Sequence, residues 1–349
     1  MESLTACCSV ANVAITIKDV AQAAGVSTAT VSRALRGLPN VDDATRARIL
    51  KVAADLDYVI SPSASRLASG RTGSVAVITP YIARWYFSTV LSGVESVLQN
   101  AGMDLLLMSV STLDGQHRLP PAPRLRRRVD GVISIALPAD DSELQDVIAL
   151  GLPTSLIGVA KDGVPSVTID DTLAARTATQ HLVSLGHQRI ALIGGNPKSL
   201  PSTTGHDRRE GFMQVLAEAG MDFDPSLEVP GYFTNAGGEQ AMLTLLQQRK
   251  RPTAVFAMSD EMAFGAMRAL RANGLVPGRD ISLIGMDGHD MSELLDLTTV
   301  AQPVFDLGRI AAEALLVQIR TGSDRVTDPV RVPTHLAVRG STAPPASTD

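Results

Sequence analysis

Cysteine and long apolar segments are both scarce in this sequence. Its 349 residues include only Cys7 and Cys8, which are adjacent near the N-terminus, so we expect neither a disulfide framework nor a cysteine metal site. No run approaches the ~18 consecutive apolar residues that span a bilayer, and no basic region followed by an apolar stretch opens the chain. These absences predict a cytoplasmic protein.

Several motifs of catalytic and cofactor chemistry are also missing. There is no Gly-x-x-x-x-Gly-Lys-Ser/Thr phosphate loop, no Gly-x-Gly-x-x-Gly after a strand, and no Gly-x-Ser-x-Gly nucleophile turn. The six histidines show no close pair at metal-ligand spacing. We therefore expect no cofactor, no metal ion and no catalytic site.

Charge is distributed unevenly along the chain. The net charge is −5, but residues 1–72 hold eight basic and six acidic side chains, so this part carries +2 and the remainder −7. A mildly basic N-terminal part on an acidic body suits a DNA-reading unit attached to a second function. The length exceeds one typical core, which predicts two or three domains.

Residues 16–35 have the pattern of two short helices joined by a tight turn. Thr16 is placed to cap the first helix with Asp19 as its capping-box partner, and Ile17, Val20, Ala21 and Ala24 recur at helical spacing. Gly25 can take the positive φ that ends a helix, and Ser27 can cap a second helix over residues 28–35. This arrangement predicts a helix-turn-helix, whose second helix fits the major groove of DNA.

The outward face of that second helix carries Thr28, Ala29, Ser32 and Arg33. Hydroxyl groups suit phosphates or base edges, methyl groups can touch thymine, and arginine can reach guanine or phosphate. A third helix is predicted from Asp43 to about residue 56, which completes a small headpiece. Two interpretations stay open for residues 61–70, a short helix or a plain linker.

From residue 73 onward, short apolar strands alternate with amphipathic helices. Such alternation predicts parallel sheets covered on both faces, and about 230 residues suffice for two of them. The predicted strands span 75–79, 105–109, 132–136, 154–158, 190–194, 254–258 and 281–286. The predicted helices span 88–101, 142–150, 173–185, 208–219, 239–248 and 261–272.

The C-terminal ends of these strands are small, polar or acidic, and open parallel sheets bind ligands at such ends. They read Thr79-Pro-Tyr81, Gly158, Gly194-Gly-Asn196, Ser259-Asp260 and Asp287-Gly288, and two facing sheets would enclose them in a cleft. His187 is interpreted as a turn residue, and the basic run 124–128 as the solvated end of a helix.

These features together resemble the LacI/GalR family of bacterial transcriptional regulators, over residues 16 to about 340. The most specific segments are Ile17–Arg33, Leu67–Gly70, Leu185–Gly195, Ser259–Gly265, Ile284–Asp287 and Thr298–Pro303. The resemblance implies an all-α helix-turn-helix headpiece on an α/β body of two doubly wound parallel-sheet lobes, similar to periplasmic binding proteins. It also implies a homodimer, or a tetramer, on a near-palindromic operator in the cytoplasm, at the nucleoid.

The family's roles carry over by position. Thr28, Ala29 and Arg33 match residues that read bases, Ser27, Thr30 and Ser32 lie near phosphates, and Leu67 matches a leucine inserted into the minor groove. Six residues match an effector site that would suit a sugar or sugar derivative. They are Tyr86, Phe87, Arg208, Phe233, Ser259 and Asp287.

The resemblance also gives the expected domain boundaries. They are a disordered tail at 1–14, a DNA-binding domain at 15–60, a hinge at 61–72, an effector-binding and dimerisation domain at 73–340, and a tail at 341–349. Within the large domain we expect an N-lobe of about 73–160 and 303–332 and a C-lobe of about 161–302 and 333–340.

The sequence departs from the family pattern in places, and two other functions compete with regulation. Gly158 stands where some members have aspartate, Asp287 lacks a second aspartate beside it, the hinge proline comes late at Pro62, and prolines interrupt residues 117–123. A periplasmic-type sugar-binding protein would need an export signal and leaves residues 16–70 without a role. An α/β enzyme would need a nucleophile–base pair or a cofactor loop.

Overall fold

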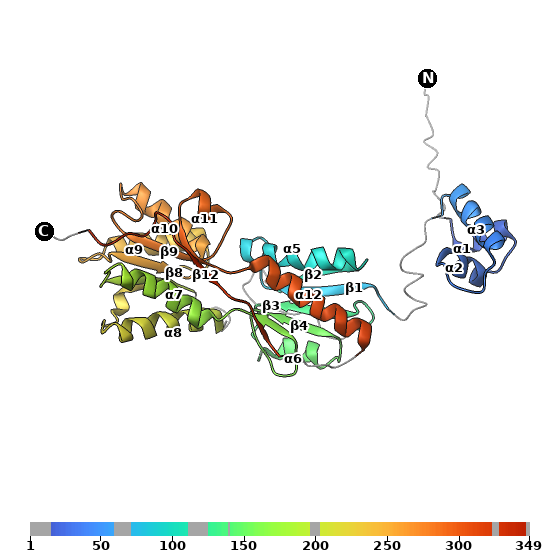
Figure 1. The fold of residues 1–349 in the computed structure, drawn as a ribbon, viewed down its shortest axis with the longest axis horizontal. Helices are drawn as coiled ribbons and strands as arrows, with labels where there is room; N and C mark the ends of the chain where they lie inside the picture. The colour runs from blue at the N-terminus through green and yellow to red at the C-terminus, as the bar shows by residue number, and fades with distance from the viewer. Residues whose placement is uncertain are drawn as a thin grey trace, which may run out of the picture. The chain divides into compact units, whose positions relative to one another are not determined.

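The computed structural model describes residues 15–58, 71–110, 125–138, 140–195, 203–322 and 328–346. The chain forms two compact units, residues 1–72 and 73–349 (Figure 1). The expected N-terminal tail, the hinge segment 61–70 with Leu67 and Pro62, and residues 117–123 lie outside the described residues. None of the described helices is long and apolar enough to cross a membrane.

The first unit begins with helix α1 (Ile17–Ala24), and its ends are built as the sequence predicts. Thr16 and Asp19 form a reciprocal capping box, in which the Asp19 carboxylate accepts from the Thr16 amide at 2.8 Å. Gly25 ends the helix in the left-handed conformation, with φ 66°. The capping residues and the glycine therefore fix both ends of this helix.

Helices α2 (Thr28–Leu35) and α3 (Asp43–Asp55) complete the headpiece. Their N-caps are Ser27, which accepts from the Thr30 amide at 3.1 Å, and Asp42, which accepts from the Thr45 amide at 2.8 Å. Arg46 on α3 donates to the Leu38 carbonyl at 2.8 Å, which ties down the connecting loop. The core between the three helices consists of Val20, Ala21, Ala24, Val31, Ala34, Ile49 and Ala53.

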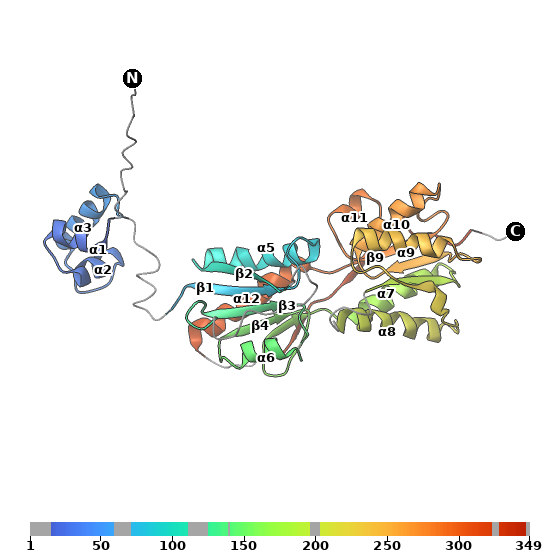
Figure 2. The same ribbon diagram turned by 180° about the vertical axis from the view of Figure 1, so that it is seen from behind.

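The second unit contains two six-stranded sheets, which define its N-lobe and C-lobe (Figures 1 and 2). The N-lobe sheet has the order β11-β5-β4-β3-β1-β2, and its described strand pairs are parallel. Its strands are β1 (Ser74–Thr79), β2 (Asp104–Ser109), β3 (Gly131–Ile135), β4 (Thr154–Ile157), β5 (Ser166–Thr168) and β11 (Val330–Arg331). Helices α5 (Trp85–Asn100), α6 (Ser142–Ile148) and α12 (Val304–Thr321) cover this sheet.

The C-lobe sheet has the order β12-β10-β9-β8-β6-β7, and only its edge strand β12 runs antiparallel among the described strands. Its strands are β6 (Ile190–Gly194), β7 (Glu228–Pro230), β8 (Ala254–Ala257), β9 (Ser282–Asp287), β10 (Thr298–Ala301) and β12 (His335–Ala337). Helices α9 (Asn235–Leu246) and α10 (Asp260–Ala272) cover one face, and α7 (Asp171–Ser184) and α8 (Thr203–Glu218) the other (Figure 1). The short α11 (Met291–Leu294) lies between β9 and β10.

The chain crosses between the lobes three times, after β5, after β10 and after β11. The expected N-lobe boundary at residue 160 is therefore wrong, because β5 pairs with β4 and keeps residues 166–168 in the N-lobe. The expected tail at 341–349 is also wrong at its start. Ser341 is buried and its carbonyl accepts from the Leu283 amide, and the Ala343 carbonyl accepts from Ser282 Oγ.

The predicted strands and helices of the body are all present, with shifted ends, but further elements were missed. The missed strands have only two to four residues, too few to show a period; they are β5, β7, β10, β11 and β12. The longest miss is α12, which packs along α5 (Figure 1). The two helices cross at Gly93 and Gly308, where a Cβ would collide with the carbonyls of Phe305 and Val90.

Two loop predictions have different outcomes. His187 lies in a turn as predicted, and its buried ring bonds to Thr253 Oγ1 and the Ala343 carbonyl, both at 2.9 Å. The basic run is not a helix end, because residues 125–128 form a turn. Leu125 and Val129 anchor that turn in the core while its arginines are exposed.

Candidate functional site

The outer face of α2 presents the predicted DNA-reading residues as one continuous surface. Thr28, Ala29 and Arg33 are exposed, and Thr30 and Ser32 are half-buried. Ser27 is exposed, but its hydroxyl already caps the helix and bonds to Thr30 Oγ1 at 2.9 Å. On this face Thr28, Ser32 and Arg33 can hydrogen-bond to phosphate and to base edges, and the Ala29 methyl group can touch a thymine methyl.

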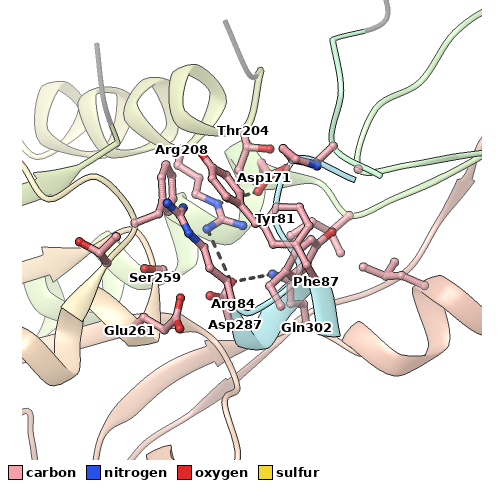
Figure 3. A pocket seen from close by; sticks show the side chains of 18 of the residues that line it. Tyr81, Arg84, Phe87, Asp171, Thr204, Arg208, Ser259, Glu261, Asp287 and Gln302 are labelled. Carbon is pink, nitrogen blue, oxygen red and sulfur yellow. Dashed lines mark hydrogen bonds and ion pairs between the residues drawn. The ribbon is translucent and has the colours of Figure 1, made fainter. Parts of the chain in front are cut away.

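A cavity of about 260 Å³ lies between the two lobes, at the C-terminal ends of both sheets (Figure 3). All six predicted effector residues, Tyr86, Phe87, Arg208, Phe233, Ser259 and Asp287, line it. Helices α5, α7, α8, α9 and α10 each begin at or beside the cavity, because each follows the C-terminal end of a strand. The remaining lining residues are Pro80, Tyr81, Arg84, Ala136, Gly158, Ile169, Asp171, Thr204, Tyr232, Thr234, Glu261, Gln302 and Leu307.

Arg208 is the central charged group of the cavity, and it is only 4% exposed. Its Nε donates to Asp171 Oδ1 at 2.7 Å, one Nη1 hydrogen bond goes to the Met258 carbonyl, and Nη1 lies 3.7 Å from Asp287 Oδ1 (Figure 3). Burial lowers the pKa of Arg208, but the attraction of Asp171 and Asp287 outweighs it and leaves that pKa raised. The guanidinium is therefore a fixed cation between two carboxyl groups.

Asp287 ends strand β9 and is 7% exposed. Burial raises the pKa of its carboxyl to about 8, although Arg208 opposes that shift. Gln302 Nε2 donates to Asp287 Oδ1 at 2.7 Å, and the backbone φ of Asp287 is 131°, where residues with a side chain are rarely found. Strain at a side chain held in a pocket points to a ligand-binding role.

Asp260 was expected at the cleft together with Ser259, but it is not among the residues that line the cavity. Its carboxylate is fully buried and accepts from the His289 amide at 2.8 Å, from Ser292 Oγ at 2.8 Å and from Thr299 Oγ1 at 2.7 Å. Burial raises its pKa. It therefore holds the loop after β9 in place and, unlike Ser259, does not line the cavity.

Aromatic side chains form opposite walls of the cavity. Tyr81, Tyr86 and Phe87 come from the N-lobe, and their rings meet edge to face, with centroids 5.5 Å apart for Tyr81 and Phe87. Phe233 comes from the C-lobe, and its ring packs so closely over Gly195 that a Cβ there would approach Cε2 to 2.6 Å. Flat apolar walls with a few polar groups are typical of small-molecule sites.

The Tyr86 hydroxyl occupies the space beside Gly158. Gly158 has φ 79°, and a Cβ there would lie 3.5 Å from Tyr86 Oη. Burial raises the pKa of Tyr86, so the phenol stays protonated and can both donate and accept a hydrogen bond. Within the described parts of the chain this hydroxyl has no partner, so it is available to a ligand.

The prediction missed several lining residues, for identifiable reasons. Asp171 and Gln302 follow β5 and β10, and neither strand was predicted. Arg84 and Glu261 lie at the starts of α5 and α10, and the sequence alone does not show which residues at a helix start face the cavity. Tyr81 stood in the predicted strand end Thr79-Pro-Tyr81, and that signal could have found it.

One cluster of metal-ligand residue types occurs among the described residues, on the first turns of α8. It consists of His206, Asp207 and Glu210, with two of the three exposed. Burial raises the pKa of Asp207. Exposed groups of this kind on one helix are common without a metal, so the cluster indicates no site by itself.

Comparison with known proteins gives two matching families of domains and many full-length relatives. Residues 16–61 match the bacterial regulatory proteins of the lacI family, and residues 179–342 match a periplasmic binding protein-like domain. The HTH-type transcriptional repressor CytR of Escherichia coli strain K12 is 35% identical over 94% of this chain and 96% of its own. The HTH-type transcriptional regulator DegA of Bacillus subtilis strain 168 is 33% identical over 94% of this chain and 98% of its own.

Solved structures give the same result. A complex of the transcriptional regulator CelR with cellobiose has a TM-score of 0.67 and 33% identity, over 94% of this chain and 99% of that one. The lac repressor dimer bound to operator and the anti-inducer ONPF has a TM-score of 0.81 and 29% identity over the same shares. With a helix-turn-helix headpiece and a two-lobed α/β body, this chain belongs to the LacI family of bacterial transcriptional regulators.

Proposed function

We propose that the protein is a transcriptional repressor whose affinity for operator DNA is controlled by a small molecule, a sugar or sugar derivative. The observation that carries this proposal is the cavity between the lobes, which combines aromatic walls with Arg208 and Asp287. Aromatic faces pack against the C–H groups of a sugar ring, and charged groups hydrogen-bond its hydroxyls. The CelR–cellobiose complex and a LacI-family regulator from Enterococcus faecium with bound ribose support this ligand class.

The six lining residues named above are proposed as effector contacts. Tyr86 supplies a hydroxyl beside Gly158, where some family members place aspartate. Ser259 has a hydroxyl that already accepts from the Met262 amide at 3.3 Å, so it can still donate to a ligand. Asp287 and Arg208 provide an acceptor and a donor at the cavity floor.

On the DNA side, Ser27, Thr28, Ala29, Thr30, Ser32 and Arg33 are proposed to contact the major groove and its phosphates, and Leu67 the minor groove. The lac repressor dimer on its operator supports a homodimer that presents two headpieces to a near-palindromic site. We place the protein at the nucleoid in the cytoplasm, acting as a binding protein and not as an enzyme. The domain boundaries stay as expected, apart from the two corrections above.

Gel-shift titration on the DNA upstream of the protein's own gene, with and without cellobiose or ribose, tests this function. We expect binding at moderate salt and release by an effector, because a ligand that prefers one lobe arrangement shifts DNA affinity reciprocally, by about 1–3 kcal/mol. Absence of DNA binding under all conditions would contradict the proposal. If a variant truncated at Gly73 kept every activity of the full chain, residues 1–72 would have no role and the sugar-binding protein would be favoured instead.

A further inference from the structure

Trp85, the single tryptophan of the chain, joins the two lobes beside the cavity. It is the first residue of α5 in the N-lobe. Its indole stacks on the His289 ring of the C-lobe, with centroids 4.6 Å apart and planes at 25°, and its Nε1 donates to Asp290 Oδ2 at 3.2 Å. An aromatic stack and a hydrogen bond from one side chain thus bridge the cleft.

His289 is a fixed platform for this contact. Its Nδ1 accepts from the Met291 amide at 3.0 Å, and its own amide donates to the buried Asp260 carboxylate at 2.8 Å. The Phe264 ring also meets the His289 ring, edge to face, with centroids 5.0 Å apart. The imidazole therefore cannot follow Trp85 if the lobes move apart, so separation would break the stack.

The backbone of Trp85 makes a second connection between the lobes. The N-cap of α5 is Arg84, whose side chain makes no capping hydrogen bond within the described chain. The carboxylate of Glu261, at the start of α10 in the C-lobe, faces the Trp85 amide; burial raises the pKa of Glu261, and that amide and Arg84 both oppose the rise. The start of α5 thus lies beside an acidic group of the other lobe, the charge that a helix N-terminus favours.

The residues next to Trp85 in these contacts line the cavity. Arg84 and Glu261 both line it, and the Arg84 guanidinium lies 3.6 Å from the centre of the Tyr81 ring, which also lines it (Figure 3). Trp85 is not among the lining residues. Its position fixes Arg84 and Glu261 at the cavity without placing Trp85 itself against a ligand.

We propose that Trp85 is a positioning residue for effector recognition, which clasps the lobes together and holds Arg84 and Glu261 at the cavity. This rests on the proposed function in one respect, that the cavity binds an effector. An occupant of the cavity and the clasp then favour the same lobe arrangement, so each stabilises the other. Loss of the clasp weakens effector binding without removing any ligand contact.

The clasp itself is tested without any effector, by the fluorescence of Trp85 in the full-length protein. Trp85 is half-buried, so we expect partial protection from acrylamide in the wild type, and quenching that rises at least about twofold with a red-shifted emission in His289→Ala and Asp290→Ala. Asp290→Asn keeps an oxygen acceptor for the indole N–H and should stay close to the wild type. Leu294→Ala, an exposed neighbour on α11, is the control for general disturbance of this loop.

Equal quenching in the wild type, His289→Ala and Asp290→Ala would overturn the clasp. Its link to the effector is measured by calorimetry with cellobiose and ribose as probes, comparing the wild type, Asp290→Asn and Trp85→Ala. We expect Trp85→Ala to raise the Kd of a bound probe about tenfold or more and Asp290→Asn to leave it within about twofold. A probe bound equally by all three overturns the positioning role, whereas a panel in which neither sugar binds counts against the proposed effector class and leaves the quenching result to decide the clasp.

Discussion

The headpiece and the inter-lobe cavity place their functional side chains in opposite ways. In the headpiece, the proposed contacts with bases and phosphates fall within residues 27–33, on one helix of eight residues. In the body, the lining residues extend from Pro80 to Leu307 and come from both sheets and both lobes. A local surface depends on one helix and its caps, whereas an assembled cavity depends on the packing of the whole body.

From this difference between headpiece and cavity we expect the largest loss of stability from a substitution in the body, at Arg208. Arg208→Ala leaves the largely buried Asp171 carboxylate without its ion-pair partner, which should reduce the free energy of unfolding by about 3–5 kcal/mol. The matched control is Arg209→Ala, the next residue, whose partner Glu228 is partly exposed and whose loss should cost only about 0–1 kcal/mol. Urea denaturation of both variants measures the difference, and equal losses would contradict it.

Asp287→Asn should separate effector binding from stability. The folded-state pKa of Asp287 is raised to about 8 from 3.8, so the folded protein binds the extra proton and loses stability as pH rises between these values. Asparagine keeps the acceptor for Gln302 without the buried charge. The variant should therefore match the wild type near pH 4 and become progressively more stable than it as pH rises, by about 1–3 kcal/mol or more at pH 8.

Thermal unfolding across pH 4–9 checks this prediction. We expect the Tm of the wild type to fall below that of Asp287→Asn as pH rises. A constant difference between the two Tm values would show that Asp287 stays ionised throughout this pH range. Effector affinity should drop most in the variant above pH 8, where the wild-type side chain is a carboxylate and a neutral amide is a weaker acceptor for sugar hydroxyls.

In the headpiece, Arg33→Ala should weaken operator binding by about 1–3 kcal/mol, because it removes a charged contact with a base or phosphate. Stability of the body and effector affinity should not change, since the contact lies on α2 alone. Arg48→Ala, an exposed arginine on α3, is the control and should change operator affinity less. Gel shifts at two salt concentrations distinguish the two variants, and an equal effect from both would argue against α2 as the reading helix.

The smallest expected effect is at the cap of α2. Ser27→Ala removes the acceptor for the Thr30 amide and should destabilise the headpiece by about 1 kcal/mol. Ser32→Ala, in the same helix without a capping role, should change stability by no more than a few tenths of that value. Amide hydrogen exchange of α2 in the full-length protein measures both, and equal exchange would contradict the role of the cap.

Most of the headpiece could be predicted because its signals are local. The capping box at Thr16 and Asp19, the left-handed Gly25 and the cap at Ser27 each act over three or four residues, within the range of one helical turn. In the body, the same reasoning found strands that read as continuous apolar runs. It missed α12, although Val304, Leu307, Ala311 and Leu315 recur at helical spacing and gave a local signal. Only its close packing on α5 at Gly93 and Gly308 needed the tertiary structure.

The sequence by itself determined the helix caps, the alternation of strands and helices, and the residue types available to a ligand. Only the tertiary structure decided that Asp171 holds Arg208, that Asp260 supports a loop while Ser259 faces the cavity, and that Trp85 reaches His289 in the other lobe. The physical reason is distance along the chain. Helix caps form between neighbours, but these contacts join residues brought together by sheet order and by three crossings between the lobes.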